Sequence, residues 1–150
     1  MATPMIETPA DRANAYRRLG WHVVLDGHDQ IILPADQVHG IQVSAALAAV
    51  VLDQLRQRGV VTPIVDNVAT GTRTFLTTAP KPDDTRTVTL FPRESRVQAI
   101  RTVPGCPIPL PTPGDDNRVW LDEPRPSRLA EFELLVRITL GAARAARKAA

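Results

Sequence analysis

The chain has 150 residues, of which 43% are hydrophobic, 4% aromatic and 23% charged, a composition typical of one globular domain rather than a disordered or fibrous protein. The formal net charge is +2, from 18 basic and 16 acidic residues, which argues against nucleic-acid binding through bulk electrostatics. The longest apolar run, residues 45–52, is far shorter than the roughly 20 residues of a membrane span, and no signal-peptide pattern precedes it. We therefore expect a cytoplasmic protein without membrane contact.

A helix and a hairpin are predicted at the start of the chain. Thr8 and Asp11 have the spacing of a capping box, which predicts a helix beginning at Pro9. Two strands follow it, and we expect Gly27 to supply the positive φ of the turn between them. These strands cover residues 21–25 and 30–33.

The middle of the chain alternates strands with one strong helix. Ser44 is a suitable N-cap for a helix over residues 45–58, whose apolar side chains repeat on one face. Strands are predicted before and after it, at residues 38–43, 60–65, 72–78, 85–91, 97–103 and 118–121. This order predicts an α+β fold with a mixed or mainly antiparallel sheet, packed by the central helix and a C-terminal helix.

The C-terminal third contains a Pro-rich segment and a long helix. Residues 104–114 hold five prolines, which excludes a central strand and indicates an extended surface segment or a recognition stretch. Ser127 is the expected N-cap of the terminal helix. The predicted organisation is a flexible N-terminus, a single domain and an Ala/Arg-rich tail that frays, at residues 1–8, 9–140 and 141–150.

No pattern in the chain predicts catalysis, a metal site or a cofactor. The histidines, His22, His28 and His39, lack the spacing of paired ligands and are expected at the surface. Cys106 is the single cysteine, and it lacks a nearby activating group. Adjacent acids stand in Pro/Gly-rich loops, where they serve solubility and turn formation, at Asp83–Asp84, Asp115–Asp116 and Asp122–Glu123.

A basic stripe is predicted on the terminal helix. Arg137, Arg144 and Lys148 fall on one side at about 100° per residue, where they could contact phosphate. The alternative is that these cations complement the helix dipole and need no ligand.

The segment 15–24, Ala-Tyr-Arg-Arg-Leu-Gly-Trp-His-Val-Val, resembles the opening of the bifunctional DNA primase/polymerase (prim-pol) N-terminal domain, with its helix, Gly-Trp pair and strand. Residues 40–43, 61–63 and 71–76 are similar to the central segment of that family. The Pro-rich piece and Trp120-Leu121 resemble the closing region of short actinobacterial proteins of this kind. The resemblance covers residues 10–140 and implies a prim-pol-like fold.

Prim-pol catalysis uses paired acids on a strand to hold two metal ions, and a histidine that contacts nucleotide phosphates. The matching strand here, residues 39–43, contains no carboxylate, and Thr74 stands near the place of the histidine. The resemblance therefore implies a catalytically silent relative, in which Arg73 remains a candidate phosphate contact.

Three functions are compatible with these observations. The first is a non-catalytic accessory or regulatory module that binds a nucleotide, a nucleic acid or a protein. The second is an interaction or self-assembling protein that uses residues 104–113 and the terminal helix. The third, an active nucleotidyl transferase, requires Asp36, Asp66 and a loop acid to converge on metal ions.

Overall fold

The computed structural model describes residues 6–90 and 98–149, with side chains as far as residue 146. Within these ranges the chain is α+β, as predicted, and the strands of both sheets pair antiparallel. The elements are α1 (Pro9–Arg18), β1 (Val24–Leu25), β2 (Ile31–Pro34), β3 (Val38–Val43), α2 (Ala45–Gln57), β4 (Ile64–Asn67), β5 (Arg73–Thr78), β6 (Ala99–Arg101), β7 (Pro107–Pro109), β8 (Arg118–Asp122) and α3 (Phe132–Ala149). The strand orders are β1-β2-β7 and β6-β3-β5-β4-β8.

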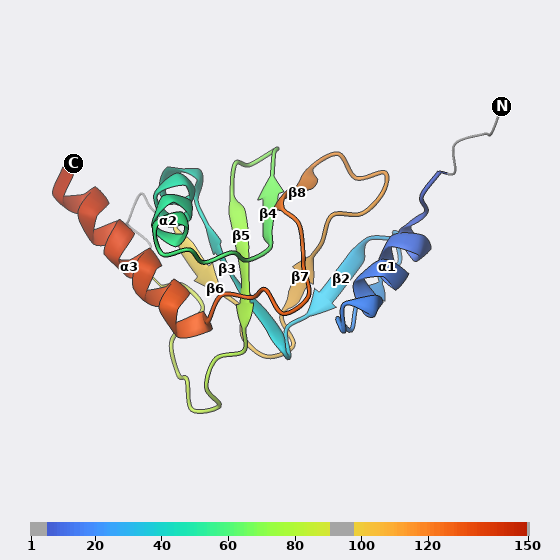
Figure 1. The fold of residues 1–150 in the computed structure, drawn as a ribbon, viewed down its shortest axis with the longest axis horizontal. Coiled ribbons are helices and arrows are strands. Elements are labelled where there is room, and N and C mark those ends of the chain that lie inside the picture. The colour runs from blue at the N-terminus through green and yellow to red at the C-terminus, as the bar shows by residue number, and fades with distance from the viewer. Residues whose placement is uncertain (1–5, 91–97, 150) are drawn as a thin grey trace.

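Two apolar cores lie on opposite faces of the larger sheet. Figure 1 shows α2 and α3 together at one end of the molecule, and α1 with β2 and β7 at the other. Successive strand residues point to opposite faces. Phe75 of β5 therefore packs in the first core, under α2 and α3, whereas Leu76 packs in the second core, with α1 and the smaller sheet. The larger sheet therefore joins the two halves of the fold.

The predicted start of α1 is confirmed, and the predicted turn after β1 is corrected. The Thr8 hydroxyl accepts from the Asp11 N–H at 3.1 Å, and the Asp11 carboxylate accepts from the Thr8 N–H at 3.0 Å. In the turn, the residue with positive φ is Asp29, at 58°, and not Gly27. The Asp26 carboxylate holds this turn by accepting backbone N–H groups on either side of Asp29, and aspartate tolerates the left-handed region.

Ser44 is the N-cap of α2, as predicted, whereas β4 begins later than expected. The Ser44 hydroxyl accepts the N–H of Gln98 at 3.2 Å and makes no hydrogen bond to the first turn of the helix. Residues 60–65 were predicted as a strand, yet β4 begins at Ile64 because Pro63 has no N–H for the ladder.

The terminal helix also begins later than predicted. Ser127 has φ of 59° and lies before α3, which starts at Phe132. At the other end, the helix continues through most of residues 141–150, the segment predicted as a tail. Ala142 and Ala143 are buried there against the first core.

Two further strand predictions hold in part. The segment predicted at 85–91 contributes an isolated bridge between Thr89 and Ile100. The segment predicted at 97–103 forms the shorter β6. Residues 91–97, which both predictions touch, lie outside the described residues.

The Pro-rich segment is extended, as predicted, but it belongs to the core. Its strand β7 occupies the edge of the smaller sheet, where prolines leave no ladder partner unsatisfied. Alternation turns Ile108 and Leu110 inward, and both are buried. The prediction of a purely surface segment is therefore wrong.

One tyrosine hydroxyl ties α1 to β8 and to the Pro-rich segment. Tyr16 donates to the carbonyl of Pro111 at 2.7 Å and accepts from Trp120 Nε1 at 3.0 Å. The Tyr16 ring also lies 6.0 Å from that of Trp21 and 5.9 Å from that of Trp120. These contacts fix the smaller sheet and α1 against the larger one.

A buried ion pair anchors the loop after β5. Arg101 is 2% exposed, and its Nη1 lies 2.8 Å from the Oδ1 of Asp84, whose side chain is 6% exposed. The guanidinium also donates to the Thr102 carbonyl and lies 4.9 Å from the centre of the Phe132 ring. Asp84 was predicted as a solvated loop acid, and that prediction is wrong because Arg101 draws it into the protein.

Replacing Arg101 with alanine leaves the Asp84 carboxylate without its buried partner. We expect the free energy of unfolding to fall by about 3–5 kcal/mol, measured by urea denaturation. Arg86, whose side chain is 36% exposed, pairs with the same carboxylate, and R86A should cost about 1 kcal/mol or less. Equal costs for the two variants would contradict a buried anchor.

Asp84 also makes stability depend on pH. Its burial alone would raise the pKa, but the Arg86 N–H and the guanidiniums of Arg101 and Arg86 outweigh burial and hold the pKa below its ordinary value. A lowered pKa contributes stability that is present above about pH 4 and is lost as the pH falls through the folded-state pKa. We expect D84N to unfold with a shallower acid dependence than the wild type, and parallel pH profiles would contradict this.

Candidate functional site

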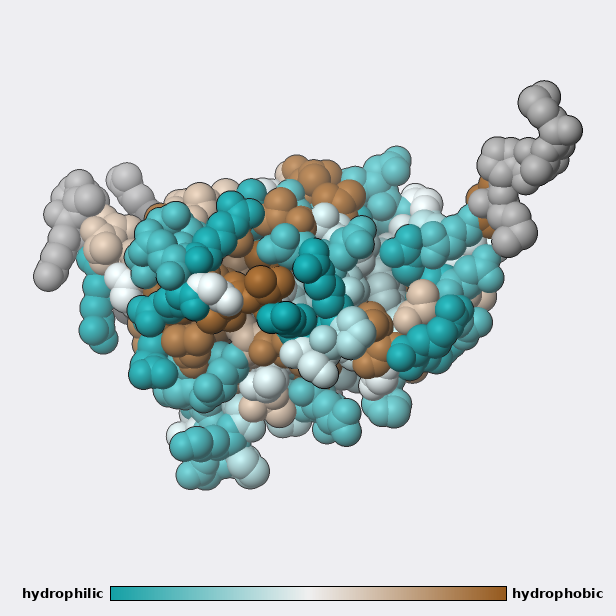
Figure 2. All heavy atoms as spheres, viewed as in Figure 1, coloured by the Kyte–Doolittle hydropathy of each residue, from teal (hydrophilic) through white to brown (hydrophobic). Residues whose placement is uncertain are grey.

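A groove between α2 and α3 is the strongest candidate site. Its volume is about 390 Å³. In Figure 2, hydrophobic residues lie between hydrophilic side chains where these two helices approach each other. The lining residues are Val50, Gln54 and Arg58 from α2 and its C-cap, and Leu134, Arg137, Ile138, Gly141, Ala142 and Ala145 from α3.

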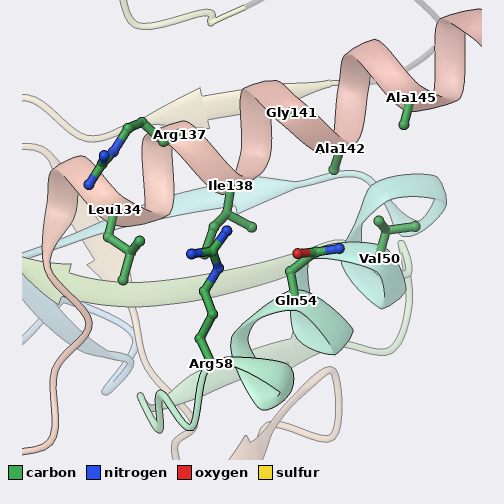
Figure 3. Close-up of a pocket in the computed structure, with 9 residues that line it drawn as sticks. All are labelled: Val50, Gln54, Arg58, Leu134, Arg137, Ile138, Gly141, Ala142 and Ala145. Atoms are coloured by element: carbon green, nitrogen blue, oxygen red, sulfur yellow. The ribbon is translucent and has the colours of Figure 1, made fainter.

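The spacing of the lining residues explains why these helices leave a groove. Val50, Gln54 and Arg58 recur every four residues on α2, on a side away from the stripe that packs on the sheet. On α3, Gly141 and Ala145 present little or no side chain toward α2 (Figure 3). Small residues at this position leave the space between the helices unfilled.

The charged groups of the groove come from both helices. In Figure 3 the Arg58 side chain reaches from the end of α2 toward Ile138 of α3, and Arg137 lies beside Leu134. In the part of the chain that the structure describes, neither guanidinium forms an ion pair or donates a hydrogen bond. Two guanidiniums beside an apolar surface can bind a ligand that has an anionic group next to an apolar part.

The local charge favours an anion more strongly than the net charge of the chain does. Segments 45–58 and 132–149 contain two acids, Asp53 and Glu133, and six basic residues. Asp53 accepts from the side chain of Gln57 at 2.8 Å, and Glu133 pairs with Arg86 at 2.6 Å. Both carboxylates are therefore engaged outside the groove.

The predicted basic residues are divided between different places. Arg137 lines the groove, whereas Arg144 is exposed on α3 and does not line it. The side chain of Lys148 lies outside the described residues. Arg73 lies on β5 and lines another hollow, next to the start of α2, where its Nε is 3.9 Å from the carboxylate of Asp66.

Sequence reasoning missed Arg58 and Gln54 as site residues. Both lie near the polar end of a helix, where charged residues are ordinary, and nothing local separates them from solvated side chains. One signal for them is the spacing: Val50, Gln54 and Arg58 recur every four residues and therefore lie on one side of α2.

The histidines differ from one another in their surroundings. His22 and His28 are exposed, as predicted, but His39 is buried and its Nδ1 lies 2.8 Å from the Thr102 hydroxyl. Burial lowers the pKa of His39, and the charge of Arg101 acts in the same direction. His39 is therefore a core residue, and the prediction of a surface position is wrong for it.

No cluster suited to a metal ion is found over residues 6–90 and 98–149: their His, Cys, Asp and Glu side chains do not form groups of three or more that could hold one. Asp36 and Asp66 are thus not joined by a third such side chain there. Among the described helices, none has the length and apolar character needed to cross a bilayer.

The chain matches no protein-family model, no curated protein and no solved structure. The similarity to the prim-pol family therefore remains a prediction from short motifs.

Because Arg58 and Arg137 have no intramolecular partner in the described chain, they should contribute little to folding. We expect R58Q/R137Q to change the free energy of unfolding by less than about 0.5 kcal/mol, measured by urea denaturation. A loss of several kcal/mol would show that these guanidiniums hold the two helices together and are not held free for a ligand.

Proposed function

We propose that this chain is a non-catalytic accessory module that binds a partner through the α2–α3 groove. The observation that carries the proposal is a pair of guanidiniums, Arg58 and Arg137, which have no ion-pair partner among the described residues and lie beside the apolar wall formed by Leu134 and Ile138. Such a surface favours a partner with anionic groups next to apolar ones, and a protein, a nucleotide or a nucleic acid can supply them.

The non-catalytic part of the proposal is supported by the character of β3. This strand occupies the place that the resemblance to prim-pol proteins gives to the metal-binding acids, and it carries no carboxylate. Its first half is packed into the protein, with His39 edge-on to Phe132 at 6.3 Å. We include the predicted kinship to prim-pol proteins and the cytoplasmic location in the proposal.

The second candidate is a protein that interacts through the Pro-rich segment and the terminal helix. These two segments differ in how far they are available to a partner. Ile108 and Leu110 of the Pro-rich segment are used in the core and cannot contact a partner without disrupting it. The terminal helix supplies most of the groove and remains available. Self-association through this helix is a specific form of the proposed binding function.

The experiment is a thermal-shift panel on the whole chain. The probes are Mg²⁺, Mn²⁺, ATP, a ten-nucleotide oligo(dT) and an acidic peptide, with sedimentation velocity to detect self-association. A probe at about a hundred times its dissociation constant adds ~2.7 kcal/mol of apparent stability. We expect an anionic probe or a second copy to bind, and to bind at least ten-fold more weakly to R58E/R137E.

The matched control is R18E/R125E, which makes the same charge change at exposed arginines away from the groove. It should bind like the wild type. No response to any probe and no self-association would contradict a binding module of this kind. A nucleotide shift that requires Mg²⁺ or Mn²⁺ would contradict the non-catalytic part.

A further inference from the structure

We infer that the α2–α3 groove receives an amphipathic α-helix of a partner protein, with carboxylates on that helix meeting Arg58 and Arg137. This inference rests on the proposed function and names the class of partner. It follows from the length of the groove, the sizes of its lining residues and the position of its charges.

The walls of the groove are two to three helical turns long. Its wall on α3 extends from Leu134 to Ala145, which is about 17 Å of helix at 1.5 Å per residue, or three turns. The opposite wall on α2 runs from Val50 to Arg58. A third helix laid between two others buries an apolar stripe of the same length.

The side chains along the groove differ from one end to the other. Gly141, Ala142 and Ala145 line one end and leave room for the larger side chains of a docked helix. Val50, on the facing wall, is 42% exposed and offers an apolar contact to the same helix. This end favours apolar groups such as leucine or methionine on the partner.

The other end selects for acidic residues. Arg58 and Arg137 come from facing walls, and both lie toward the Leu134 end of the groove in Figure 3. A guanidinium binds a carboxylate with two parallel hydrogen bonds, and Gln54 adds an amide nearby. The partner helix is therefore expected to carry Glu or Asp near one of its ends.

The same arrangement disfavours a nucleic acid as the occupant. A strand of nucleic acid presents a phosphate at every nucleotide and is held by a row of basic groups with aromatic stacking platforms. Among the described lining residues, the two charges lie toward one end, the others are Gln54 and small or apolar residues, and none has an aromatic ring.

The test is a titration of the ¹⁵N-labelled full chain, followed by heteronuclear NMR. The probe is an amidated 18-residue peptide that presents leucines along one helical face, with glutamates flanking that face over the turns nearest one end. One control peptide has lysine in place of each glutamate, and another has the same composition with leucines scattered around the helix. We expect the glutamate peptide to shift the amide signals of residues 50–58 and 134–145, and to bind at least ten-fold more tightly than either control peptide.

Charge reversal separates recognition from general stickiness. In R58E/R137E we expect the preference to invert, so that the lysine peptide binds more tightly than the glutamate peptide. R18E/R125E should keep the wild-type preference. The unperturbed amide spectrum of each variant establishes that it is folded.

Three results would overturn the inference. The first is equal binding of the glutamate and lysine peptides, and the second is a set of shifts located away from the groove. The third is a groove that responds to oligo(dT) or ATP and to neither peptide, in which case the proposed binding function stands and the helical partner is wrong. If no peptide, nucleotide, oligonucleotide or second copy affects the groove, the proposed function fails as well.

Discussion

Burial of both faces of the five-stranded sheet is the constraint on which the rest of the structure depends. The consecutive residues Phe75 and Leu76 of β5 are fully buried, on opposite sides, so each face requires its own cover. The helices α2 and α3 cover one face, and α1 with the smaller sheet covers the other. A chain with few aromatic residues achieves this with Val, Leu, Ile and Ala, and places its two tryptophans in the second core around Tyr16.

The groove follows from how the first face is covered. Two helices packed side by side on a sheet use their inner sides for the core, and their outer sides meet only where side chains are large enough. Gly141 and Ala145 of α3 are too small to reach α2, and Arg58 and Gln54 of α2 are polar. The two helices pack on each other and on the sheet through their inner sides, and their shared outer surface can receive a partner without loss of the core.

The Arg101–Asp84 pair fastens the loop after β5 to the edge strand β6. Asp84 also accepts from Arg86, whose other nitrogen reaches Glu133 in the first turn of α3. The loop after β5, the edge strand β6 and the start of α3 are therefore linked by one chain of charged groups. Because Arg101 lies over the ring of Phe132, the same chain also enters the first core.

Local patterns were sufficient to predict much of the fold. The capping box at Thr8, the periodicity of residues 45–58 and the strand segments 38–43 and 72–78 each predicted an element that is observed. Two predictions failed where local signals indicate one role and the folded chain assigns another: Ser127 has a positive φ before α3, and Asp84 pairs with the distant Arg101. Local preferences are worth about 1 kcal/mol each, and tertiary contacts outweigh them.

The sequence by itself determined the α+β class, the order of most elements and the presence of cations on the terminal helix. Only the tertiary structure decided that Arg137 and Arg58 line one groove, that Arg144 does not line it, and that Arg73 belongs to a separate hollow. The physical reason is that a repeat within one helix defines a face of that helix. Which element lies opposite that face, and how much space separates them, depends on tertiary packing. Here it depends on how two segments far apart in the chain, residues 45–58 and 132–149, pack on a common sheet.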